Sequence, residues 1–436
     1  MLATPVVVLI SSLLVLLAGG IGIAVSLLAV GVIGIEFFSA APLCNVMATA
    51  VWSSTTSWTL SSLPLFVWMG EILFRTKLSE DMFEGLAPWI VRLPGGLLHV
   101  NNIGSAIFAA VSGSSAVTAA TIGRISLPEL KARGYPDRIA VGTLAGSATL
   151  GFLIPPSIPM IVYGVGAELS IARLFIAGVV PGLMILAIFM IYTGVWSILN
   201  RDIMPKVTER TSLSEKLRRL RRVGPIILLV IGVIGSIYFG IATPTESAAI
   251  GVVGALVLSA LERTLTWSSF VESVMAAART TCMIGFIIAA AGFLTVMLAF
   301  TKLPIELANW IASLQLSPYT LIGLLTVFYV ILGCFLEGIS IMILSAAIMV
   351  PVVQKAGFDL IWFGIYLVLV IEMALITPPV GFNLFVIQAL TKHNMLYIAR
   401  AAFPFFVLLL FATALITIWP QIVLWLPDLM LNRAKT

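Results

Sequence analysis

The sequence predicts an all-α polytopic membrane protein, organised as an inverted repeat with two re-entrant helical hairpins and two spans broken by Pro-Pro pairs. Three observations predict this class: an apolar composition, a series of span-length apolar segments, and motifs that recur at a fixed offset. Hydrophobic residues make up 60% of the 436 residues and charged residues only 10%. Because a soluble domain carries about 25% charged residues, the composition excludes a soluble globular enzyme, a disordered protein and a nucleic-acid-binding protein. The expected surroundings are a lipid bilayer, and the weak alternating segments of an outer-membrane barrel are absent.

Apolar segments long enough to cross a bilayer recur along the chain. About 20 apolar residues form one span, and the candidate spans are residues 5–33, 57–75, 137–165, 171–199, 225–242, 245–261, 281–300, 361–390 and 401–427. No charged residue lies between Met1 and Ile35. Since a cleavable signal peptide starts with a positively charged region, we interpret the first segment as a retained span.

Two further apolar stretches, residues 96–130 and 319–352, are interrupted at their middles by small polar residues. The first is broken from Ser112 to Ser115 and the second from Glu337 to Ser340. Irregular backbone at membrane depth is tolerated only inside protein or beside water. Each stretch therefore predicts a re-entrant hairpin whose tip avoids lipid, the alternative being a pair of ordinary kinked spans.

The charge distribution predicts the orientation. Residues 200–224 carry eight Lys and Arg against three Asp and Glu, a net charge of 8 − 3 = +5. The positive-inside rule places this loop in the cytoplasm, and two intervening spans place residues 124–138 on the same side. We expect the basic loop to lie at the lipid headgroups rather than to bind nucleic acid.

An internal repeat appears at an offset of 223 residues. Its matching pairs are Ile125 and Ile348, Pro128 and Pro351, Gly134 and Gly357, Tyr135 and Phe358, and Pro155-Pro156 and Pro378-Pro379. Five predicted spans separate the copies, and an odd number inverts the second copy across the membrane. This division predicts a first repeat at residues 1–199, a basic loop and connecting span at 200–244, and an inverted second repeat at 245–436.

The two Pro-Pro pairs interrupt the spans 137–165 and 361–390, because proline cannot continue an α-helix. Lipid cannot satisfy the backbone groups that a break frees, so these groups line a cavity. The N-terminal end of a half-helix attracts a carboxylate, whereas a C-terminal end exposes carbonyls that suit Na⁺. Inverted repeats with interrupted helices are typical of secondary transporters. The sequence therefore predicts transport of a small carboxylated solute.

The candidate site residues lie at the hairpin tips and the breaks. For the substrate we expect Ser114, Ser115, Pro156, Ser157, Pro379 and Gly381. For Na⁺ we expect Ser112, Gly113 and Ser114 in one repeat and Gly338, Ser340, Thr377 and Pro378 in the other.

Acidic residues at membrane depth are costly and usually functional. Glu337 and Glu372 are therefore candidates for an ion-linked or gating role, the alternative being a pair with a buried Arg or a helix-end carbonyl. Glu246, by contrast, follows a good helix start with Thr243 as the N-cap. With three Cys and two His in the chain, we expect neither a disulfide framework nor a His-based metal site, and no cofactor besides the coupling ion.

Stretches spread over most of the chain resemble the large membrane subunit of tripartite ATP-independent periplasmic (TRAP) transporters, the dicarboxylate and sialic-acid type of permease. The matching stretches are Pro64 to Glu71, Ser112 to Gly123, Leu150 to Ser157, Thr243 to Ala249 and Ile376 to Gly381.

This resemblance implies a multi-pass protein of the bacterial inner membrane that works by Na⁺ symport. It implies a small four-span membrane partner and a periplasmic substrate-binding protein that delivers an organic acid. It also implies an elevator mechanism, in which hairpins and broken spans move against a fixed scaffold. The alternatives are another Na⁺- or H⁺-coupled organic anion transporter that acts alone, and a membrane-embedded enzyme. The enzyme is disfavoured because neither H-E-x-x-H nor G-x-S-x-G occurs.

Overall fold

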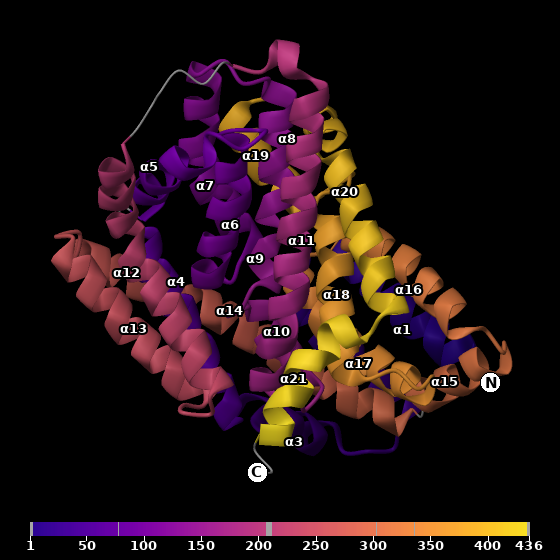
Figure 1. The fold of residues 1–436 in the computed structure, drawn as a ribbon. Helices are drawn as coiled ribbons and strands as arrows, with labels where there is room; N and C mark the ends of the chain where they lie inside the picture. Colours follow the sequence, from indigo (N-terminus) through magenta and orange to yellow (C-terminus); the bar gives the residue numbers. More distant parts are fainter. Residues whose placement is uncertain (1–2, 77, 206–211, 302, 335, 434–436) are drawn as a thin grey trace.

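The computed structural model describes residues 3–76, 78–205, 212–301, 303–334 and 336–433, and every regular element in these ranges is helical (Figure 1). The first half of the chain contains α1 Ala3–Ala18, α2 Ile23–Phe38, α3 Leu43–Thr55, η1 Trp58–Ser61, α4 Ser62–Phe74, α5 Leu78–Ile90, α6 Leu98–Ser112, α7 Ser115–Ala132, α8 Asp137–Ala148, α9 Leu150–Leu153, α10 Ile158–Gly166, α11 Ile171–Leu199 and η2 Arg201–Ile203. The second half contains α12 Leu213–Tyr238, α13 Pro244–Leu261, α14 Trp267–Phe300, α15 Leu303–Ser313, α16 Pro318–Gly333, α17 Gly338–Lys355, α18 Leu360–Leu375, α19 Phe382–Thr391, α20 Met395–Ile418 and α21 Gln421–Arg433.

Two predicted spans are divided in the structure. The segment 5–33 is not one helix, because α1 ends before Gly19 and α2 begins at Ile23, with Gly20 at a φ of +76°. The segment 401–427 is divided between α20 and α21, and Pro420 stands between them where it cannot continue the first helix. Among the described residues, five helical runs are long and apolar enough to cross a membrane alone, and other apolar helices are shorter or bent.

The basic segment after α11 is partly helical rather than a loop throughout. Ser212 caps α12, so that the helix begins in the basic region and continues into the apolar one. The Lys216 carbonyl accepts a hydrogen bond from the Trp89 ring nitrogen at 3.3 Å, and its ammonium lies 5.7 Å from the ring centre. This contact fixes the start of α12 against α5. Residues 206–211, which include Lys206 and Arg210, lie outside the described residues.

The helix α18 is the centre of the molecule. Every residue from Ile361 to Leu375 is buried, and α18 contacts α9, α10, α11, α16, α17 and α20. A helix that is apolar on all sides either spans a membrane or is buried in protein, and these contacts show that α18 is buried in protein. The second broken span is thus held on all sides by both halves of the chain.

The predicted repeat is visible in local structure. The helices α7 and α17 have the same length of 18 residues, and their first residues, Ser115 and Gly338, are 223 apart. Both helices end with a glycine in the left-handed region, at a φ of +79° for Gly134 and +83° for Gly357.

The residue after each glycine closes the same turn. The Tyr135 amide donates to the Leu130 carbonyl at 3.0 Å, and the Phe358 amide donates to the Val353 carbonyl at 3.1 Å. These are the hydrogen bonds of a Schellman helix end. The two copies therefore end their helices by the same mechanism at equivalent positions.

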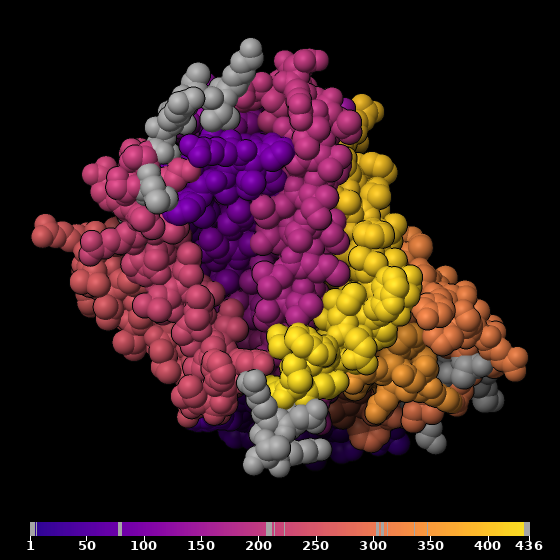
Figure 2. All heavy atoms as spheres, viewed as in Figure 1, coloured from indigo at the N-terminus to yellow at the C-terminus, as the bar shows by residue number. Residues whose placement is uncertain are grey.

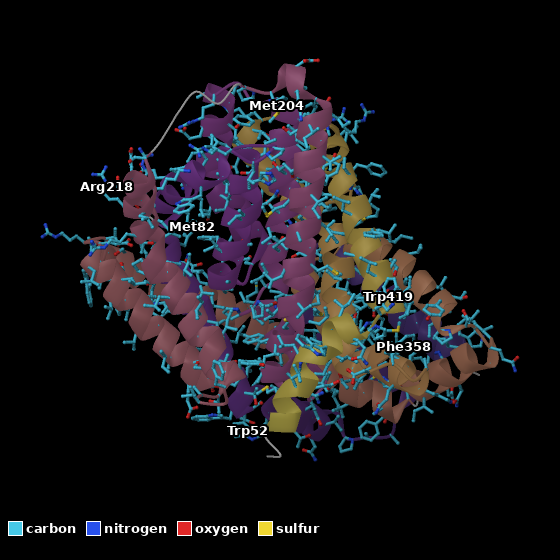
Figure 3. The ribbon with its side chains drawn as sticks, in the orientation of Figure 1. Trp52, Met82, Met204, Arg218, Phe358 and Trp419 are labelled. Atoms are coloured by element: carbon cyan, nitrogen blue, oxygen red, sulfur yellow. The ribbon has the colours of Figure 1, made fainter. Side chains whose placement is uncertain are left out.

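Labelled side chains mark the two ends of the molecule in Figure 3. Met204 and Arg218 lie toward the upper end, whereas Trp52 and Phe358 lie in the lower half. Met204 packs against the apolar cluster that contains Tyr135, and Phe358 is the repeat partner of Tyr135. The corresponding turns of the two copies thus lie at different heights.

The first hairpin is attached to the first broken span by buried polar pairs. The Asn101 amide donates to the Thr143 hydroxyl at 2.9 Å, and the hydroxyls of Ser105 and Ser147 are 3.0 Å apart. All four side chains are inaccessible to solvent. The pairs join α6 to α8 along their length, so the two elements form one packed unit.

A second group of helices forms the other side of the molecule. The long helix α14 packs along α2, α3 and α4, while α13 packs on α4 and α12 packs on α5 and α13. The space-filling view shows the segment that contains α5 to α7 enclosed between α12 and α11 on one face (Figure 2). The cavity described next lies between this group and the hairpins.

Candidate functional site

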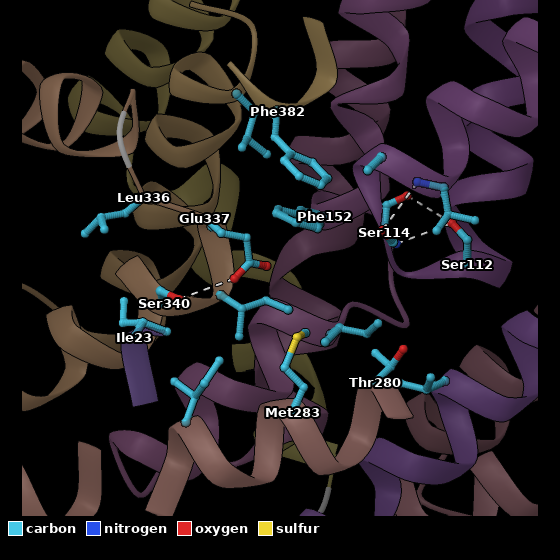
Figure 4. A pocket seen from close by; sticks show the side chains of 18 of the residues that line it. Ile23, Ser112, Ser114, Phe152, Thr280, Met283, Leu336, Glu337, Ser340 and Phe382 are labelled. Carbon is cyan, nitrogen blue, oxygen red and sulfur yellow. Dashed lines mark hydrogen bonds between the residues drawn. The ribbon is translucent and has the colours of Figure 1, made fainter. Parts of the chain in front are cut away.

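A cavity of about 710 Å³ lies where the two hairpin tips face each other. Its wall is formed by the tips, by the ends of the broken spans, and by the helices α2, α4 and α14. Ser112 and Ser114 lie on one side, Glu337 and Ser340 on the other, and Phe152 stands between them (Figure 4). Ligand pockets for small molecules have volumes of roughly 300–1,000 Å³, so this cavity has room for one small solute.

The first tip is a short turn stabilised by its own hydroxyls. Gly113 has a φ of +58°, which favours glycine. Ser114 is the N-cap of α7 and accepts from the Val117 amide, while the Ser112 and Thr118 hydroxyls are 2.9 Å apart. The amides at the start of α7 point toward the cavity end of this hairpin. The tip thus presents a helix N-terminus flanked by serine hydroxyls.

The first break lies directly behind this tip. The Ile158 amide donates to the Gly113 carbonyl at 3.4 Å. A Cβ atom on Gly113 would lie 2.8 Å from the Pro156 carbonyl oxygen, and one on Gly151 would lie 2.6 Å from the Ser114 carbonyl oxygen. Hairpin and broken span therefore meet backbone to backbone at two glycines.

Ser157 caps the half-helix α10 after the break. Its hydroxyl accepts from the Met160 amide at 3.4 Å and donates to the Phe152 carbonyl at 2.5 Å. Ser157 and Pro156 are buried, and neither lines the cavity described above. These two predicted substrate residues therefore support the tip from behind.

The second tip is built from Glu337, Gly338 and Ser340. Glu337 occupies the N-cap position of α17, and the Ser340 hydroxyl donates to its carboxylate at 3.3 Å. A Cβ atom on Gly338 would lie 2.8 Å from a ring carbon of Phe152 and 2.8 Å from a methyl carbon of Ile371. The second tip is thus packed against the broken spans of both repeats, and all three residues line the cavity.

The second break follows α18. The Thr377 hydroxyl donates to the Met373 carbonyl at 2.6 Å, and the Cys334 thiol donates to the Pro378 carbonyl at 3.3 Å. Pro379 is exposed, whereas Gly381 is buried with a φ of +45° at the start of α19. The predicted cation residues Thr377 and Pro378 therefore lie beside the second hairpin. In both breaks the bond between the two prolines is cis.

A buried polar cluster joins the two repeats behind the first tip. The Ser115 hydroxyl lies 3.0 Å from a Glu372 carboxylate oxygen and 3.1 Å from the Ala148 carbonyl, and it accepts a hydrogen bond from the Asn383 amide at 2.6 Å. Ser115 and Asn383 are fully buried, and Glu372 is 1% exposed. The predicted residues Ser115 and Glu372 thus meet, although they lie in different repeats.

Several site residues were missed by the sequence reasoning. Asn383 carries the visible signal of an amide in an apolar helix directly after a break. Phe152, Phe382 and the cavity-facing residues of α2 and α14, such as Met283, are apolar residues in apolar segments. Nothing in their local sequence separates them from lipid-facing or core residues.

The charges on the cavity wall are few. Among the described residues that line it, Glu71 and Glu337 are acidic and none is Lys or Arg. Glu71 forms an ion pair with Arg75 one helical turn away. The positive partial charges available to an anion are the N-terminal ends of helices that border the cavity, which are those of α2, α7, α10, α17 and α19. Glu246, in contrast, forms a capping box with Thr243, with hydrogen bonds of 2.8 and 3.3 Å, which confirms the expected helix start.

The arrangement defines a multi-pass membrane transporter, with two helical hairpins and two broken spans around one cavity. Solved structures share the fold. The YdaH transporter of Alcanivorax borkumensis matches with a TM-score of 0.66 and 11% identity over 95% of this chain and 98% of that chain. MtrF of Neisseria gonorrhoeae matches with a TM-score of 0.55 and 13% identity over 95% and 94% of the two chains.

Sequence comparison is more specific. Residues 10–422 match the family model of the tripartite ATP-independent periplasmic transporter, DctM component. The C4-dicarboxylate TRAP transporter large permease protein DctM of Pseudomonas aeruginosa is 34% identical over 88% of this chain and 89% of that protein. The sialic acid TRAP transporter large permease protein SiaM of Vibrio cholerae is 29% identical over 90% and 91% of the two chains. The ectoine/5-hydroxyectoine large permease protein UehC of Ruegeria pomeroyi is 30% identical over 86% and 87%.

The chain therefore belongs to the DctM family and is a TRAP transporter large permease, a multi-pass protein of the inner membrane. This confirms the resemblance expected from the motifs. The three relatives named above are large permease proteins, in agreement with a transporter.

Proposed function

We propose that this permease imports a small carboxylated solute by Na⁺ symport, together with a small membrane subunit and a periplasmic substrate-binding protein. The observation that carries the proposal is the pair of helix N-termini, at Ser115 of α7 and Gly338 of α17, at the two tips that border one cavity. Amides at a helix N-terminus favour an anion. With no Lys or Arg among the described lining residues, these amides, nearby hydroxyls and bound cations hold the acid group.

Two Na⁺ ions bind where each tip meets its own break. In the first repeat the oxygens come from Ser112, Gly113 and Ser114, next to the Pro156 carbonyl. In the second repeat they come from Gly338, Ser340, Thr377 and Pro378. The support is the close approach of each tip to a break, through Gly113 and Pro156 in one repeat and Cys334 and Pro378 in the other. Hydroxyl and carbonyl oxygens suit a hard cation.

The moving unit consists of the hairpins and broken spans, and the scaffold contains α2, α4 and α14. The support for this elevator division is packing. The first hairpin is attached to its broken span by buried polar pairs. The scaffold borders the cavity and also packs on the hairpins, through α4 on α6 and α14 on α17. A bound solute between the two groups would therefore move with the tips.

The names of the relatives do not identify the substrate of this chain, because the relatives are named for different solutes. They are called transporters of C4-dicarboxylate, sialic acid, ectoine and isethionate. For this chain we propose a small organic acid with one carboxylate near Ser114 and the N-terminal end of α7. Selection among acids then rests with the binding protein and with the apolar part of the cavity wall, which includes Phe152 and Phe382.

Uptake into proteoliposomes tests the proposal. The vesicles contain the permease with the small subunit, the binding protein is added outside with a radiolabelled organic acid, and a Na⁺ gradient is imposed. Uptake is expected to rise steeply with external Na⁺. Full uptake in Na⁺-free buffer under a proton gradient would contradict Na⁺ coupling and favour a proton-coupled transporter. Full uptake without the small subunit and binding protein would favour a permease that acts alone.

A further inference from the structure

Glu372 is an ionisable group at the centre of the fold. It lies in the last turn of α18 and is 1% exposed. Among the described residues, no salt bridge involves its carboxylate. An isolated charge in a low-dielectric interior is very costly unless it is compensated. The structure therefore requires either a proton or a cation at this carboxylate.

Two oxygen atoms at this place have no hydrogen-bond partner. They are Glu372 Oε1 and Asn383 Oδ1, and both are buried. The remaining polar atoms of these side chains are already engaged, since Glu372 Oε2 and Asn383 Nδ2 both contact the Ser115 hydroxyl at 3.0 and 2.6 Å. The hydrogen bonds of this cluster therefore all involve the Ser115 hydroxyl. Glu372 Oε1 and Asn383 Oδ1 remain bare, without a hydrogen-bond partner. Buried polar atoms without a partner are rare and require an explanation.

The surrounding dipoles favour a cation. The carboxylate is in the C-terminal turn of α18, and the Ala148 carbonyl that approaches Ser115 is at the C-terminal end of α8. C-terminal helix ends carry partial negative charge. The two oxygens without partners belong to a carboxylate and a side-chain amide, and oxygens of these kinds are the ligands that hard cations prefer.

We propose that Glu372, Asn383 and Ser115 form an additional Na⁺ site that joins the two repeats, separate from the two sites at the hairpin tips. The identity of the ion rests on the Na⁺ coupling proposed above. The bound ion neutralises the only carboxylate of α18 and ties the first residue of α7, in the first repeat, to α18 and α19, in the second. An occupied site therefore holds the first hairpin to the second broken span.

Direct measurement of bound ²²Na⁺ tests this site. The full-length permease is purified in lipid nanodiscs, and saturation binding is compared for the wild type, Glu372→Gln and Glu129→Gln. Glu129 is the matched control, because its carboxylate is about half exposed and pairs with Arg133. We expect Glu372→Gln to lose one bound Na⁺ per permease and to keep the others, while Glu129→Gln binds as the wild type does.

The outcomes separate this inference from the proposed function. Unchanged Na⁺ stoichiometry in Glu372→Gln would overturn the additional site and indicate that a proton compensates Glu372. A wild type that binds no Na⁺ would overturn the coupling ion itself, and the additional site with it.

A second variant keeps the test decisive if Glu372→Gln does not fold. Asn383→Leu removes the bare amide oxygen at similar volume and leaves the carboxylate in place. Its Na⁺ affinity at one site is expected to fall by about tenfold or more, with the stoichiometry recovered at high Na⁺. Wild-type affinity at every site in this variant would overturn the inference.

Discussion

The Ser115 hydroxyl and the Glu372 carboxylate, 257 residues apart in the chain, lie 3.0 Å apart in the buried interior. Ser115 is the first residue of α7 at the tip of one hairpin, and Glu372 is in the last turn of the central helix. Through this contact the first tip is positioned by the second repeat as well as by its own. The tip, the two breaks and α18 therefore form one packed unit, and changes at their contacts are expected to affect transport.

A bulky side chain at Ser115 tests the importance of this contact. Ser115 is fully buried, so Ser115→Leu displaces the tip from Glu372 and Asn383. We expect uptake to fall on the order of a hundredfold, since displacements near 1 Å can have effects of this size. The measurement is uptake in proteoliposomes alongside the amount of permease in the membrane.

Ser53→Leu is the control for this substitution, because Ser53 is exposed on α3. Ser54 in the same stretch is unsuitable, because its side chain packs directly against Gly292 of α14. Loss of uptake in Ser53→Leu with normal uptake in Ser115→Leu would contradict the site assignment.

Gly151→Ala tests the backbone contact between the first hairpin and the first broken span. The new methyl group would lie 2.6 Å from backbone atoms of Ser114 and Ser115, which cannot move as a flexible side chain can. Overpacking of this kind costs about 1–3 kcal/mol. We expect a lower unfolding temperature and reduced uptake.

Gly232→Ala is the matched control in α12, where the added methyl meets no atom within 4 Å. Alanine favours a helix over glycine by about 1 kcal/mol, so this variant is expected to be as stable as the wild type or more so. Equal stability of the two variants in a thermal-shift assay would refute the close approach at Gly151.

Ser157→Ala separates a capping role from a substrate contact. The hydroxyl caps α10 through the Met160 amide and bonds the Phe152 carbonyl. Loss of an N-cap costs about 1 kcal/mol. We expect reduced thermal stability with an unchanged apparent affinity for the solute. A large increase in KM at unchanged stability would instead mean that Ser157 contacts the solute.

The inverted repeat predicts opposite sides for two equivalent turns. Single cysteines are introduced as Arg133→Cys and Lys355→Cys, both at exposed positions, in a background that lacks Cys44, Cys282 and Cys334. With an impermeant thiol reagent we expect labelling of the first only from the cytoplasmic side and of the second only from the periplasmic side. Labelling of both from one side would rule out the inversion.

The features that the sequence alone predicted are those that local chemistry determines. A Pro-Pro pair ends a helix wherever it stands, because proline has no N–H to donate. Gly134 and Gly357 end α7 and α17, because glycine adopts the left-handed conformation at little cost. Thr243 and Glu246 start α13 through hydrogen bonds three residues apart. The glycines between Gly19 and Gly22 indicated a helix end in the same way. The continuous apolar pattern of residues 5–33 nevertheless led to the prediction of one span, which the structure divides into α1 and α2.

Tertiary structure alone decided which of these local features meet. Ser115 and Glu372 lie in separate repeats, and no spacing in the chain relates a hairpin tip to the end of a distant helix. Phe152 and Met283 became cavity residues only through packing, because in a membrane protein an apolar side chain looks the same in sequence whether it faces lipid, core or cavity. The pattern of apolar residues in a bilayer protein specifies where helices run, whereas the contacts between helices depend on shape and on a few buried polar groups.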